Sequence, residues 1–127
     1  MQIALTVASA SYCTRKKVGA LIVKNNNIIA IGYNGTISGF ENICELKDGS
    51  TNPEVLHAES NAIAKCAKSS NSSDGATLYV TLSPCFECAK IIIQSGIKEV
   101  VYLEEYRNTE GIKLLNKSKV NVKQILL

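Results

Sequence analysis

Hydrophobic residues along the chain fall into short continuous runs that are separated by polar turns and by segments with helical spacing. Runs of this length, bounded by Asn, Gly or Ser, are typical of buried β-strands. Asn25 and Asn26 separate the first two runs and predict a hairpin turn. The expected strands cover residues 18–24, 27–31, 76–82, 100–103 and, with looser alternation, 120–126.

Helical spacing of apolar residues fills the intervals between these runs. Helices are expected over residues 58–68, 85–95 and 110–117, preceded by an amphipathic helix near the N-terminus. Ser83 and Pro84 are typical of a helix start, as are Asn52 and Pro53, and Gly96 is typical of a helix end. Strands that alternate with helices predict a largely parallel sheet covered on both faces. The expected fold is therefore α/β, a three-layer α/β/α domain with a five-stranded mixed sheet.

The length of 127 residues and the 46% hydrophobic content predict a single domain that spans residues 1–127. No apolar run approaches the roughly 20 residues of a membrane span, so no membrane partner is expected. The first ten residues lack the basic start of a secretory leader, which favours the helical interpretation.

Charge and cysteine content narrow the class of protein further. A formal charge of +3 is too small to indicate nucleic-acid binding, but it is compatible with a small anionic substrate. Five cysteines are an odd number for a disulfide framework, so a cytoplasmic location is expected. Cys13 and Cys44 could approach each other, but in a reducing cytosol two free thiols are expected, and Cys66 would be a core residue.

One motif carries candidate chemistry: His57-Ala58-Glu59, followed later by Pro84-Cys85-Phe86-Glu87-Cys88. His57, Cys85 and Cys88 would supply three zinc ligands, which leaves the fourth tetrahedral position open for water. Water bound there loses a proton near neutral pH, and Glu59 could move that proton without ligating the metal. A closed structural zinc site, with Cys13, Cys44 or Cys66 as fourth ligand, is the alternative, but it gives Glu59 no role.

Beside this motif, four further segments carry a family resemblance that covers nearly the whole chain: residues 14–20, 32–35, 76–85 and 94–98. The chain resembles the cytidine deaminase-like superfamily and, within it, the deoxycytidylate (dCMP) deaminases, including phage-encoded members. The resemblance implies hydrolytic deamination of dCMP to dUMP with one catalytic Zn²⁺ per chain, in the host cytoplasm if the chain is phage-encoded. Many relatives carry a longer insert with extra Cys and His residues between Gly35 and His57. Here only Cys44 lies in that stretch, so no second zinc is expected.

The same resemblance implies substrate contacts. Asn34 and the backbone groups of Ala58 and Ser83 would contact the sugar or base. Arg15, Tyr106 and Arg107 are candidates for the 5′-phosphate, because the guanidinium fork suits bidentate phosphate binding. Each arginine alone is more often a solvated surface residue.

Regulation and assembly are also implied by the family. The segment Gly32-Tyr33-Asn34-Gly35 is associated in dCMP deaminases with a regulatory nucleotide, which could bring Mg²⁺. A homo-oligomer, either a hexamer or a dimer, is expected.

Other functions stay open at the level of sequence. The substrate could be another cytosine nucleotide or nucleoside, such as dCTP or deoxycytidine. Base editing of RNA or single-stranded DNA is less favoured, because the chain has no Trp and only two Phe to stack on bases. A zinc-binding module without enzymatic activity is the alternative from a different class.

Overall fold

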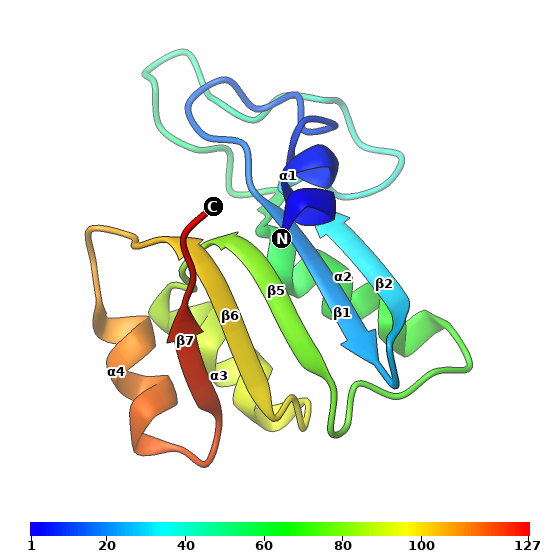
Figure 1. The fold of residues 1–127 in the computed structure, drawn as a ribbon. Coiled ribbons are helices and arrows are strands. Elements are labelled where there is room, and N and C mark those ends of the chain that lie inside the picture. The colour runs from blue at the N-terminus through cyan, green and yellow to red at the C-terminus, as the bar shows by residue number, and fades with distance from the viewer.

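A five-stranded mixed sheet forms the centre of the computed structural model, which describes residues 1–127 (Figure 1). β1 pairs antiparallel with β2 and with β5, whereas β5, β6 and β7 run parallel. The expectation of a five-stranded mixed sheet is confirmed. In spatial order the strands are β2 (Asn27–Tyr33), β1 (Gly19–Lys24), β5 (Thr77–Leu82), β6 (Glu99–Glu104) and β7 (Asn121–Gln124).

Helices cover both faces of the sheet, unequally (Figure 1). Two glycines in paired strands allow two of the helices to approach closely. A Cβ at Gly19 would clash with the backbone of α1, and a Cβ at Gly32 would lie 2.5 Å from the carbonyl oxygen of Ala58 in α2. Gly19 is paired with Tyr33 and Gly32 with Ala20, so the two glycines face opposite sides of the sheet. The helices are α1 (Gln2–Ala8), α2 (Ala58–Lys68), α3 (Phe86–Gln94) and α4 (Glu110–Lys117).

The parallel half of the sheet follows the β-α-β rule. α3 connects β5 to β6 and α4 connects β6 to β7, and right-handed crossovers place both helices on the face that α2 also covers. The main core lies between these helices and the sheet. Its largest fully buried side chains include Ile22, Leu78, Val80, Ile92 and Val100.

Local turn chemistry agrees with the sequence. Asn25 and Asn26 have φ values of 51° and 63°, the left-handed region that a tight hairpin requires. Gly96 has φ of 82° directly after the C-cap Ser95 and ends α3.

Two predicted helix starts are wrong. Asn52 does not begin a helix, because its side-chain oxygen accepts from the Glu54 amide in a turn that precedes a short strand. Ser83 does not cap α3, because its hydroxyl accepts from the amide of Tyr106 instead. The cap is Cys85, whose sulfur accepts from the amide of Cys88. A ribbon of β3 (Gly35–Thr36) and β4 (Val55–Leu56) was not predicted, since two-residue strands leave no periodic pattern.

A long loop between β3 and β4 arches over the edge of the sheet at which β5 and β6 end (Figure 1). Cys44 in this loop forms a disulfide with Cys13, so the prediction of two free thiols is wrong. The backbone brings the two residues together, with 5.2 Å between their Cα atoms, a separation typical of disulfides. The expectation of free thiols came from the assumed reducing cytosol and not from the separation of 31 residues between the two cysteines.

None of the helices is long and apolar enough to cross a membrane.

Candidate active site

A cavity of about 200 Å³ opens under the long loop, at the carboxyl ends of β5 and β6 and the amino ends of α2 and α3. Open α/β sheets commonly bind ligands at this edge. His57, Ala58 and Glu59 line it from the start of α2, and Ser83 and Cys85 line it from the connection between β5 and α3.

His57, Cys85 and Cys88 converge beside this cavity. The His57 Nδ1 atom lies 3.5 Å from the Cys85 sulfur and 3.3 Å from the Cys88 sulfur. The three candidate ligand atoms all lie within 4.8 Å of one another, and no fourth Cys, His or acidic residue joins the group. Cys66 is a buried free thiol elsewhere, and Cys13 and Cys44 are bonded to each other. The geometry is therefore that of a three-ligand site and excludes the closed site with a fourth cysteine.

Helix caps explain how this cluster forms. His57 is the N-cap of α2 and Cys85 is the N-cap of α3, both with extended backbone angles. An N-cap side chain lies at the amino end of its helix, so the two caps can meet although α2 and α3 begin 28 residues apart. Cys88, in the first turn of α3, adds the second sulfur.

The electrostatics of the cluster favour a thiolate. Hydrogen bonds from Cys88 and then from His57 lower the pKa of the Cys85 thiol to about 4, despite its partial burial. The pKa of Cys88 is raised, chiefly because its thiol donates to Cys85. The pKa of His57 is raised by its hydrogen bond with Cys85. Imidazole and thiolate donors in this arrangement fit Zn²⁺, which would deprotonate the Cys88 thiol on binding.

Glu59 lies in the first turn of α2 and only 4% of its surface is exposed. Burial raises the pKa of its carboxyl group to about 7, while the nearby His57 opposes the shift. A carboxyl group with a pKa near neutrality can both accept and donate a proton. His57 precedes the helix and Glu59 lies within it, which explains how residues only two apart can serve one site.

Ala58 and Ser83 offer backbone groups to the cavity. The amide of Ala58 is the first of α2 and has no hydrogen-bond partner within the chain. The Ser83 amide donates to the carbonyl oxygen of Glu104 at 2.8 Å, and its own carbonyl oxygen accepts no hydrogen bond. The free groups are therefore the Ala58 amide and the Ser83 carbonyl.

Within the segment from Gly32 to Gly35, only Asn34 lines the cavity. Its side chain donates to the Lys16 carbonyl oxygen at 2.8 Å and accepts from the Val18 amide at 2.9 Å. The Tyr33 ring stacks under the ammonium group of Lys65, 5.5 Å away. Asn34 therefore holds the chain before β1 in place, and one amide proton of its side chain is left for a ligand.

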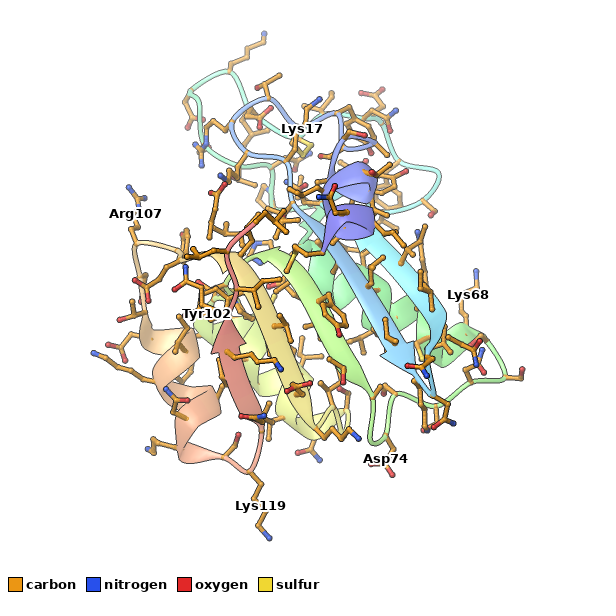
Figure 2. All side chains as sticks on the ribbon, viewed as in Figure 1. Lys17, Lys68, Asp74, Tyr102, Arg107 and Lys119 are labelled. Atoms are coloured by element: carbon orange, nitrogen blue, oxygen red, sulfur yellow. A yellow bond between two sulfur atoms is a disulfide. The ribbon has the colours of Figure 1, made fainter.

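Two of the three candidate phosphate residues line the cavity and the third does not. Arg15 and Tyr106 line the cavity, but Arg107 does not, and its exposed side chain projects away from the body of the molecule (Figure 2). Arg107, a candidate for the 5′-phosphate, is therefore not brought to this cavity. Its place after β6 was read correctly, but the sequence does not show which way the side chain points.

Sequence reasoning missed two further charged residues of the cavity, Lys16 and Glu45. Glu45 accepts from the hydroxyl group of Thr14 at 3.0 Å and from the backbone amides of Thr14 and Arg15. Lys16 stands next to Arg15 in a basic run, which was the available signal. No sequence signal marked Glu45, because only the path of the long loop brings it near.

Comparison with known proteins identifies the family. Residues 1–104 match the model of the cytidine and deoxycytidylate deaminase zinc-binding region. The deoxycytidylate deaminase of enterobacteria phage T4 is 36% identical, over 98% of this chain and 91% of its own length. The human deoxycytidylate deaminase is 42% identical over 83% of this chain, which spans 62% of the human protein.

A solved structure is similar over almost all of both chains. The dCMP deaminase of cyanophage S-TIM5, crystallised in complex with dCMP and dUMP, aligns with a TM-score of 0.96 and 54% identity. The alignment covers 98% of this chain and 92% of that one. This agreement confirms the expected fold and the resemblance to dCMP deaminases. The chain belongs to the cytidine and deoxycytidylate deaminase zinc-binding family.

Proposed function

We propose that this chain converts dCMP to dUMP and ammonia by hydrolysis. The observation that carries the proposal is the three-ligand His57, Cys85 and Cys88 cluster beside the buried carboxyl group of Glu59, in one cavity. Membership of a deaminase family and the dCMP and dUMP complex of the cyanophage relative support the choice of nucleotide.

His57 through Nδ1, Cys85 and Cys88 would hold one zinc ion. When bound, zinc would lower the pKa of a water molecule in the cavity, so that a nucleophile is available near neutral pH. The lowered pKa of the Cys85 thiol favours the thiolate form that zinc prefers as a ligand.

Glu59 would serve as the proton carrier. Its carboxylate would take a proton from the attacking water and deliver it to N3 of cytosine. It would then assist proton transfer to the amino group at C4, which leaves as ammonia. The burial that raises the pKa of Glu59 to about 7 suits both directions of transfer at neutral pH.

The backbone would orient the base. The free Ala58 amide can donate to the O2 atom of cytosine, and the free Ser83 carbonyl oxygen can accept from the amino group. The remaining amide proton of Asn34 can bond a sugar hydroxyl group. Arg15 and Tyr106, two of the candidate phosphate contacts, lie in the cavity wall.

Regulation, assembly and location remain proposals from the resemblance. A regulatory nucleotide with Mg²⁺ at residues 32–35 has no support from the packing, since Gly32 lies directly against α2. A homo-oligomer, dimer or hexamer, would bury exposed apolar side chains such as Ile3 and Phe40, which are 53% and 48% exposed. The cytoplasm is the proposed location, because nucleotides are made there.

One assay tests the substrate. Zinc-loaded protein is supplied in parallel with dCMP, deoxycytidine, cytidine and dCTP, and ammonia release is measured. We expect the highest kcat/KM with dCMP. A preference for deoxycytidine would contradict the nucleotide assignment. No turnover of any of the four would favour the zinc-binding module.

A further inference from the structure

We propose that Lys16 is the residue that recognises the 5′-phosphate, and that Arg15 only positions the loop above it. The inference rests on the proposed function and assigns nucleotide specificity to a side chain that the sequence did not single out. A nucleotide phosphate carries between −1.5 and −2 charges near neutral pH, so a cation must meet it in the cavity. Apart from His57 in the metal cluster, the basic residues that line the cavity are Arg15 and Lys16.

Arg15 is already engaged. Its guanidinium group donates to the carbonyl oxygen of Gly49 and, at 3.2 Å, to the hydroxyl group of Thr51. Its backbone amide donates to Glu45, and this hydrogen bond lowers the pKa of that carboxyl group more than the charge of Arg15 does. The arginine thus ties the segment before β1 to the long loop, and a carboxylate lies beside it that would repel a phosphate.

Lys16 is held differently. Its ammonium group has one partner, a carboxylate oxygen of Glu104 at 2.6 Å, and both side chains are at least half exposed. Ion pairs with this exposure stabilise a protein by little, so the ammonium can exchange Glu104 for a phosphate at small cost. The Lys16 ammonium group would therefore pair with Glu104 when no nucleotide is bound and with the phosphate when one is.

The backbone of Lys16 is fixed close to the residues that line the cavity and to the candidate metal ligands. Its carbonyl oxygen accepts from Asn34, which lines the same cavity. On the other side, the carbonyl oxygen of Glu104 accepts from the amide of Ser83, two residues before the candidate metal ligand Cys85. The ion pair therefore spans from the chain before β1 to the ends of β5 and β6, at the rim of the cavity. A nucleotide whose base lies near Glu59 would direct its phosphate to this rim.

The neighbouring Lys17 provides a matched control. It has the same charge and an exposed side chain (Figure 2). It is not among the residues that line the cavity. We compare wild type, Lys16→Ala, Lys16→Arg and Lys17→Ala in kcat/KM for dCMP and for deoxycytidine. Affinities for dUMP and for deoxyuridine, measured by calorimetry, give a second readout that does not depend on turnover.

Lys16→Ala should lower kcat/KM for dCMP and affinity for dUMP about ten- to a hundredfold, the usual range for a hydrogen bond to a charged group. The values for deoxycytidine and deoxyuridine should stay within about twofold, since these ligands have no phosphate. Lys16→Arg should retain more dUMP affinity than Lys16→Ala, and Lys17→Ala should match wild type. Equal losses on nucleotide and nucleoside, or the same loss in Lys17→Ala, would overturn the assignment.

Glu104→Gln tests whether Lys16 exchanges the Glu104 carboxylate for the phosphate. Removal of the competing carboxylate should free Lys16 and strengthen dUMP binding severalfold, without effect on deoxyuridine. Weaker dUMP binding would show that Glu104 belongs to the bound state and would overturn the exchange. Failure of the proposed function would look different, because wild type itself would then show no preference for dCMP over deoxycytidine.

Discussion

At the scale of single residues, the site depends on where two helices begin. His57 and Cys85 are helix caps with extended backbones, so their side chains meet at the amino ends of α2 and α3. The spacing of the motif predicted the ligands and the separate role of Glu59. It could not predict the caps, because Ser83 has a good capping side chain that is used instead to fix the chain at Tyr106.

The metal count tests this arrangement. Cys85→Ala or Cys88→Ala removes one of three ligands, so purified protein should bind zinc far more weakly, whereas Cys66→Ala should keep it. Elemental analysis of wild type should find one zinc per chain, since no fourth cysteine is near and Cys13 and Cys44 are bonded to each other. Two tightly held zinc ions per chain, or full zinc content in Cys88→Ala, would contradict the ligand set.

Arg15 and Arg107 show which properties of a single residue the sequence does not predict. Both lie where chain connections approach the cavity, as expected, but Arg15 is bonded to the loop and Arg107 points to solvent (Figure 2). The position of a residue along the chain follows from the order of strands and helices. Its rotamer and partners depend on tertiary contacts that the sequence alone does not show.

At the scale of elements, segments with clear periodicity were predicted closely, α3 ending one residue inside each expected bound, and irregular segments were not. α2 and α4 have the predicted bounds, and the expected hairpin forms at Asn25 and Asn26. The long loop before β4 has no periodicity, so its path over the cavity could not be predicted. Its anchors are non-local: the Cys13–Cys44 disulfide, the Glu45 to Thr14 hydrogen bonds and the contacts of Arg15.

The disulfide gives a prediction for this loop. A bond between residues 31 apart should stabilise the fold by about 3–4 kcal/mol through chain entropy. Oxidised wild type should therefore unfold at a higher temperature than Cys13→Ser/Cys44→Ser, measured by calorimetry without reductant. Added dithiothreitol should lower the unfolding temperature of wild type and leave the double variant unchanged. Equal unfolding temperatures without reductant would show that the loop does not depend on the bond.

The Cys13–Cys44 disulfide also concerns the expected location of the protein in the cytoplasm. In a cytosol rich in thiols the pair could be reduced, and the expectation of free thiols rested on that argument alone. The structure shows that the backbone brings the two residues into bonding distance whatever the compartment.

At the scale of the whole molecule, the fold was predictable because several signals agreed. Apolar runs, turn residues and the alternation of strands with helices all indicated a covered sheet. The layer that contains α1 is thin, since one helix of seven residues covers only part of its face (Figure 1). The edge where β5 and β6 end then gathers residues from five separate parts of the chain into one cavity.

The central claim is that this cavity deaminates dCMP with Glu59 as proton carrier. The most direct test is the rate of dUMP formation from dCMP by wild type and by Glu59→Gln, both shown to contain equal zinc. Glutamine keeps the size and the hydrogen-bonding capacity but cannot carry the proton, so the rate should fall at least about 10²–10⁴-fold. A zinc-loaded Glu59→Gln protein that forms dUMP at close to the wild-type rate would contradict the account.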